Sequence, residues 1–128
     1  MLELTINNQV YGFNFGLGFL KEVNGSVQLD VDGVKNVKKN IGLRFLLARL
    51  NEYDTEALLE TLLAANKGQN PRVTAKELES YIDDSTTEID GLFAEVWRFL
   101  ESANATKKMV AAWRADVEAE KAKMKTKS

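Results

Sequence analysis

The sequence predicts an α+β fold that is mostly α-helical, with an N-terminal β-hairpin packed on a bundle of about five to six helices. The hairpin follows from an alternating apolar pattern on both sides of an Asn-Asn pair near the start of the chain. The helices follow from apolar residues that recur every three or four positions, with capping residues in front of several of them. A chain of 128 residues that is 45% hydrophobic can fill one core of this kind.

The hairpin prediction depends on the residues around positions 7 and 8. A two-residue turn there requires positive φ at both positions, which Asn tolerates better than most residues. The resulting register pairs Ile6 with Gln9, Leu4 with Tyr11 and Leu2 with Phe13. It places one apolar face against the helices, because two strands alone are marginally stable in water. The side chains on this face are Leu2, Leu4, Ile6, Tyr11 and Phe13.

Five helices are expected between the hairpin and a helical tail. Residues 15–23 also alternate like a strand, but their leucine spacing and the Asn-Gly pair that follows favour a helix. Residues 26–33 form either a short strand or an ordered loop, and we interpret them as a turn. The helix expected near residues 36–50 is either continuous or broken at residues 40–42. The five helices are expected near residues 16–23, 36–50, 55–66, 75–82 and 86–103.

Capping residues predict where three of these helices start. Asp54 is expected to cap one helix, and Thr74 with Glu77 forms a capping box in front of the next. Ser85 and Glu88 repeat that pattern before the last of the five, which has the longest apolar stripe in the chain. We expect this stripe to be buried, and its members are Ile89, Leu92, Phe93, Val96, Trp97 and Leu100.

The composition argues against an enzyme, a metal site and a cofactor. The chain has no His and no Cys, so the usual neutral-pH base, thiolate nucleophile and transition-metal ligands are missing. The Gly16-x-Gly18 pair lacks the third glycine of a dinucleotide-binding loop. No apolar run is long enough to span a membrane, and the first residues do not have the order of a signal peptide. We therefore expect a soluble intracellular protein.

The charge divides the chain into two parts. Residues 1–106 contain 10 Lys and Arg against 16 Asp and Glu, a net charge of −6, whereas residues 107–128 contain 7 against 3, a net charge of +4. We expect residues 1–106 to form a single globular domain and residues 107–128 to form a basic amphipathic helix or tail that is partly disordered.

The tail is the predicted contact site. Four of its large apolar residues share one helical face, but the rest is too rich in Ala and Lys to form a core alone. The apolar stripe must therefore rest on the body, on another copy of the chain in a homo-oligomer, or on a partner protein. An aromatic pair near the hairpin is the alternative contact site. The candidate residues for partner binding are Met109, Val110, Trp113, Val117, Lys107, Lys108, Phe15 and Phe19.

Several stretches together, over about residues 1–110, resemble a tail assembly chaperone of long, non-contractile-tailed bacteriophages. Their order and spacing carry the resemblance, since each is mainly core and cap residues. The stretches are the hairpin Leu4-x-Ile6-Asn7 running into Phe13-x-Phe15-Gly16-Leu17-Gly18-Phe19-Leu20-x-Glu22, Leu50-x-x-Tyr53-Asp54, Pro71-x-Val73-Thr74, Tyr81-Ile82-Asp83, Leu92-Phe93-x-Glu95-Val96, and Leu100 and Ser102 before Ala105-Thr106-Lys107-Lys108.

The resemblance implies a non-catalytic protein of the host cell cytoplasm that is absent from the mature virion. It implies that the protein binds the tape measure protein and helps to recruit tail-tube (major tail) subunits. It also implies a longer form made by translational frameshift, with which a Lys-rich C-terminus is compatible. A small nucleic-acid-binding module that uses the basic tail is the alternative function, although the acidic body argues against nucleic acid as a partner.

Overall fold

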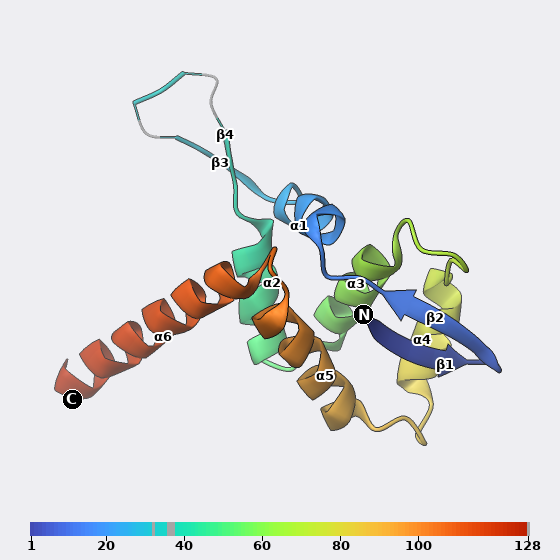
Figure 1. Ribbon diagram of the computed structural model, residues 1–128. Coiled ribbons are helices and arrows are strands. Elements are labelled where there is room, and N and C mark those ends of the chain that lie inside the picture. The colour runs from blue at the N-terminus through green and yellow to red at the C-terminus, as the bar shows by residue number, and fades with distance from the viewer. Residues whose placement is uncertain (32, 36–37, 128) are drawn as a thin grey trace.

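The computed structural model describes residues 1–31, 33–35 and 38–127. Within them the chain forms two small antiparallel sheets and six helices, which confirms the predicted α+β, mostly helical class (Figure 1). In chain order the elements are β1 (Leu2–Ile6), β2 (Gln9–Phe13), α1 (Leu17–Asn24), β3 (Gln28–Asp30), β4 (Lys38–Asn40), α2 (Gly42–Asn51), α3 (Thr55–Asn66), α4 (Ala75–Asp83), α5 (Ile89–Ser102) and α6 (Lys107–Lys127).

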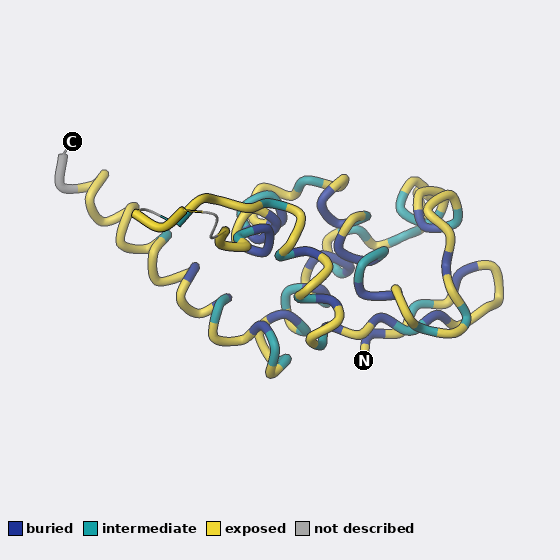
Figure 2. The backbone as a smooth tube through the Cα atoms, turned by 90° about the horizontal axis from the view of Figure 1, so that it is seen from above, coloured by how far each residue is buried: buried dark blue, intermediate teal, exposed yellow. Residues whose placement is uncertain are grey.

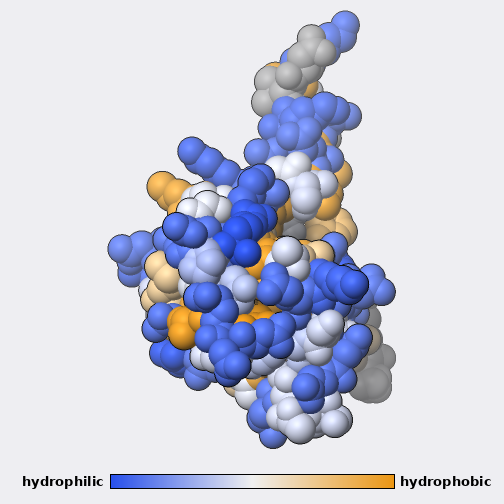
Figure 3. Space-filling view, turned by 90° about the vertical axis from the view of Figure 1, so that its right-hand side faces the viewer, coloured by the Kyte–Doolittle hydropathy of each residue, from blue (hydrophilic) through white to orange (hydrophobic). Residues whose placement is uncertain are grey.

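The β1–β2 hairpin has the predicted register, in which Ile6 pairs with Gln9 and Leu2 with Phe13. Asn7 and Asn8 adopt φ values of 52° and 65°, as the tight turn requires. The apolar face of the hairpin packs on α3, α4 and α5. From the hairpin side the surface shows only small apolar areas between polar ones (Figure 3).

Helix α3 is the centre of the body, because it contacts β2, α1, α2 and α4. As predicted, it begins after Asp54. The Asp54 carboxylate accepts hydrogen bonds from the backbone N–H groups of Glu56 and Ala57. At its other end the fully buried amide of Asn66 donates to the carbonyl of Gly12 at 2.9 Å and accepts from the N–H of Val73 at 2.7 Å. This one side chain therefore joins β2, α3 and the loop before α4.

The predicted capping box of Thr74 and Glu77 is present at the start of α4. The predicted box of Ser85 and Glu88 is wrong. Helix α5 begins only at Ile89, and Glu88 is its N-cap without a capping side-chain hydrogen bond. The physical reason is a competing turn, since the Asp84 carboxylate accepts from both the backbone N–H and the hydroxyl of Thr86. Residues 86–88 are therefore not helical.

The predicted helix over residues 36–50 is wrong at its start. Residues 38–40 form β4, which pairs with β3, and α2 begins at Gly42; residues 36 and 37 lie outside the described residues. Residues 28–30 form a strand, β3, so for these residues the strand alternative is correct and the interpretation as a turn is wrong. We name residues 28–30 and 38–40 the β3–β4 arm, which projects from the body between α1 and α2 (Figure 1).

Gly42 lies at the closest contact between α1 and α2. A Cβ at this position would overlap the carbonyl oxygen of Val23, so the start of α2 lies directly against the end of α1. The contact is completed by the side-chain oxygen of Asn24, which accepts a hydrogen bond from the N–H of Leu43.

Helix α6 packs its first half on α5 and α2 and extends away from the body with its second half (Figures 1 and 2). Trp113 stacks on Trp97 of α5, with ring centroids 5.9 Å apart. Trp97 itself is only partly buried, so the prediction that it lies in the core interior is wrong. The expected division of the chain at residue 106 stays a prediction.

Candidate interaction surface

The described residues hold neither a metal-binding cluster nor a membrane-spanning helix. Among the described residues no group of three or more His, Cys, Asp and Glu side chains could hold a metal ion. Across the same residues no helix combines the length and the apolar character that crossing a membrane needs.

The apolar residues predicted as the tail contact site lie against the body of the same chain. Val110 is 2% exposed and Trp113 is 9% exposed, while Met109 and Val117 are partly buried beside the core. Of the three supports that the sequence left open for this stripe, the structure shows the chain's own body. Only the lysines among the α6 candidates, Lys107 and Lys108, are exposed.

Phe15 and Phe19, the alternative candidates, also lie in the core, each 3% exposed. Their rings meet edge to face with centroids 5.0 Å apart, and the ring of Phe15 stacks on Phe99 of α5. Phe15 and Phe19 belong to the same hydrophobic core as Val110 and Trp113. Both predicted groups are therefore used mainly in packing the body.

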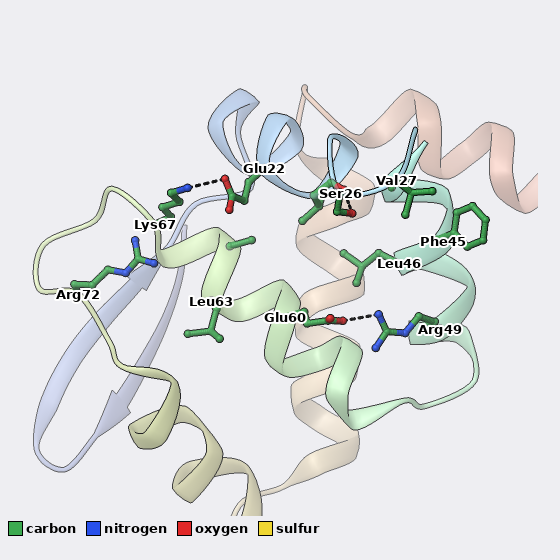
Figure 4. A pocket seen from close by; sticks show the side chains of 13 residues that line it. Glu22, Ser26, Val27, Phe45, Leu46, Arg49, Glu60, Leu63, Lys67 and Arg72 are labelled. Carbon is green, nitrogen blue, oxygen red and sulfur yellow. Dashed lines mark hydrogen bonds and ion pairs between the residues drawn. The ribbon is translucent and has the colours of Figure 1, made fainter. Parts of the chain in front are cut away.

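A groove that the sequence analysis missed opens between three helices (Figure 4). It has a volume of about 350 Å³ and is walled by α1, α2, α3 and the base of the β3–β4 arm. We name it the α1–α2–α3 groove. Its lining residues are Glu22, Val23, Ser26, Val27, Gly42, Phe45, Leu46, Arg49, Glu60, Leu63, Ala64, Lys67 and Arg72.

Phe45 is the most informative residue of the groove, because its ring is 54% exposed. The apolar residues that α2 does bury are Leu43, Leu46, Leu47 and Leu50. These four are spaced i, i+3, i+4 and i+7, so they complete a core-facing stripe without Phe45. That spacing was the signal that could have placed Phe45 on the surface.

Two ion pairs close the ends of the α1–α2–α3 groove (Figure 4). At one end Lys67, the C-cap residue of α3, pairs with Glu22 of α1 at 2.7 Å. At the other end Arg49 of α2 pairs with Glu60 of α3. The two α3 members are seven residues apart, which corresponds to two helical turns, or about 10 Å. The groove is therefore about as long as two turns of helix, with Leu63 between its ends.

Electrostatics hold Arg49 firmly at its end of the groove. Its guanidinium also donates to Asp54 at 2.9 Å, and the Asp54 carboxylate caps α3. The hydrogen bond from Arg49, helped by the N–H groups at the start of α3, lowers the pKa of Asp54 below its ordinary value. The same pairing raises the pKa of Arg49. Arg49 therefore remains charged and fixed between two carboxylates.

Arg72 differs from the other charged residues of the groove. Its side chain lies at the Lys67 end of the groove and is exposed (Figure 4). Among the described residues it has no hydrogen-bond or ion-pair partner, whereas both lining carboxylates, Glu22 and Glu60, are paired with lining cations. The groove thus has an apolar floor, two neutralised ends and one unpaired positive charge.

Comparison with known proteins identifies the family. A family model described as "Phage tail assembly chaperone protein, TAC" matches residues 3–114. The match includes the whole groove and ends one residue after Trp113, within α6. No curated protein and no solved structure matches the chain. The family match covers most of the chain, and the protein therefore belongs to the phage tail assembly chaperone family.

Proposed function

We propose that this chaperone binds the tape measure protein during tail assembly and helps to recruit tail-tube subunits to it, without catalysis. The observation that carries the proposal is the exposed apolar groove on a member of this family. A protein that shields apolar segments of a long partner needs an apolar surface that its own fold leaves uncovered, and Phe45 supplies part of one.

Such a protein acts before the virion is complete, so we propose that it works in the host cytoplasm and is absent from mature particles. A longer form made by translational frameshift belongs to the same proposal. Mass spectrometry of infected cells and of purified virions tests both points. The chaperone and its longer form are expected in cells, and neither is expected in virions; abundant chaperone in virions would contradict the proposed role.

Co-expression provides the main test of partner binding. The chaperone should co-purify with the tape measure protein of the same phage, and tail-tube protein should join this complex when all three are expressed. A chaperone that co-purifies with neither partner would refute the proposal. The matched control is the same chaperone co-expressed with an unrelated phage structural protein, which should not be retained.

The extended half of α6 is tested separately by ending the chain after Val117. This truncation keeps the packed residues of α6, which a truncation at residue 106 would remove together with Trp113. If the tail lysines contribute to partner binding, the truncated protein should bind the tape measure protein more weakly, with a smaller dependence on salt. Unchanged binding would show that the extended half is not needed.

The structure adds no support for the nucleic-acid alternative. Two lysines of the extended half, Lys121 and Lys123, pair with Glu118 and Glu120 of the same helix. Part of the positive charge is therefore neutralised within α6, and the body carries a net negative charge.

A further inference from the structure

We infer that the α1–α2–α3 groove docks one amphipathic helix of a partner protein, whose apolar side chains contact Phe45 and Leu63 and whose acidic side chain pairs with Arg72. The inference deepens the proposed function, and it rests on that function only in naming the tape measure protein as the source of the helix.

The size of the groove fits a helix face. Its ends are two turns of α3 apart, about 10 Å, which is also the distance between residues i and i+7 of a docked helix. Apolar residues at i, i+3 or i+4, and i+7 form the usual set of contacts when a helix lies in a groove. The volume of about 350 Å³ leaves room for apolar side chains on a floor that includes Leu46, Leu63 and Ala64.

The walls of the groove favour a helix over an extended strand. Three of its walls are helices, whose interior backbone groups are bonded within each helix. At the helix ends beside the groove, the carbonyl of Val23 accepts from the Ser26 hydroxyl and the N–H of Leu43 donates to Asn24. At the base of the arm, the N–H of Ile41 already donates to the carbonyl of Val27 at 2.9 Å. A docked segment therefore has little backbone to bond with and must satisfy its own N–H and C=O groups, as a helix does.

Charge selects the kind of helix. Glu22 and Glu60 are paired within the groove, so Arg72 offers the unpaired charge. The planar guanidinium of Arg binds a carboxylate with two parallel hydrogen bonds, which makes an Asp or Glu the matching residue on the partner. The same charge disfavours the α6 helix of a second copy, because residues 107–128 carry a net charge of +4.

The test compares substitutions in the groove with matched substitutions outside it. Phe45→Ala removes an exposed ring from the groove, and Leu17→Ala removes a side chain that is 64% exposed on α1, outside the groove. Arg72→Glu reverses the unpaired charge, and Lys76→Glu reverses an exposed charge on α4. The tape measure protein should bind at least tenfold more weakly to both groove variants and within twofold of the original affinity to both controls. Circular dichroism should show an unchanged fold in all four.

Overlapping peptides from the tape measure protein then identify the docked segment. The peptide that binds should gain helical circular dichroism when bound and should contain an acidic residue beside its apolar stripe. Replacing that residue with Arg should abolish binding to the original chaperone and restore binding to Arg72→Glu. Failure of this exchange for every acidic residue of the peptide would overturn the assigned pairing.

The outcomes separate the groove from the proposed function. If the original chaperone binds the tape measure protein and both groove variants bind equally well, the groove is not the docking site, but the proposed function stands. If the original chaperone does not bind the tape measure protein at all, the proposed function and the named partner both fail. If Phe45→Ala instead dissociates a chaperone oligomer in sedimentation equilibrium, a second copy occupies the groove and the inference is overturned.

Discussion

Replacing Trp113 with Ala should lower the free energy of unfolding by about 3 kcal/mol. The side chain is 9% exposed, and truncating a buried large aromatic costs about 3–5 kcal/mol. We choose the low end because the site lies at the edge of the body, on a helix that has one free half. The stack on Trp97 accounts for about 0.5–1.5 kcal/mol of this amount.

The loss has an upper limit set by α6 itself. Besides Trp113, the helix holds to the body through Val110 and two partly buried residues, Met109 and Val117. If the substitution costs more than the free energy that holds α6 on the body, the helix detaches. The free energy of unfolding of the remaining body then falls no further. Detachment would appear as a smaller dependence of the free energy on urea, because less surface remains to be exposed on unfolding.

Urea unfolding followed by circular dichroism measures this prediction without relying on the fluorescence of the replaced residue. Met124→Ala on the same helix is the control, since its side chain is 72% exposed and its loss should change stability by less than about 0.5 kcal/mol. Trp97→Ala should cost about 2 kcal/mol, because that ring is only partly buried. If Trp113→Ala cost no more than the control, α6 would not be docked, and its apolar stripe would be free for a partner.

Two further predictions concern the body. Gly42→Ala should destabilise the protein by about 3 kcal/mol or prevent folding, because the added methyl group overlaps the end of α1. Gly18→Ala is the control, since its methyl group would meet open space and should stabilise helix α1 slightly. Equal urea midpoints for the two variants would contradict the close helix contact. Hydrogen bonds from the backbone and hydroxyl of Thr74 and from the Tyr11 hydroxyl lower the pKa of Glu77 in the folded state. The stability they provide is therefore present above the unfolded pKa of about 4.3 and lost as the pH falls through the folded value. Glu77→Gln should reduce stability at pH 7 and weaken the loss of stability on acidification, and an unchanged pH dependence would show that this carboxylate is not linked to folding.

The elements that the sequence predicted well depend on nearby residues. The hairpin register follows from Asn7 and Asn8, whose backbone angles fix the turn. The start of α3 follows from the Asp54 cap, and the start of α4 from its capping box. In each case the residues that decide the structure lie within a few positions of it, so a pattern along the chain is enough to identify them.

The elements that the sequence predicted wrongly depend on competition or on distant contacts. Asp84 makes a turn that delays the start of α5, although Ser85 and Glu88 have the spacing of a capping box. Residues 38–40 pair with β3 instead of joining α2, and this pairing joins segments that no local pattern connects. The groove was missed for a different reason in each part: the spacing of the buried leucines of α2 could have placed Phe45 on the surface, but no local pattern brings the helices that wall the groove together.

The contact between α1 and α2 also fixes the base of the β3–β4 arm, which makes the arm a suitable place for a fluorescent label. Asn24 and Leu43 are joined by a hydrogen bond, and the N–H of Ile41 donates to Val27, so both ends of the β3–β4 arm are fixed at the body. Lengthening the arm costs little, about 0.6 kcal/mol for each doubling of a flexible loop. Since the chain contains no Cys, Leu29→Cys on this arm would be its single thiol, at a position that is 55% exposed. A fluorophore attached there would lie near the base of the groove and report on its occupation without touching the three helices that form it.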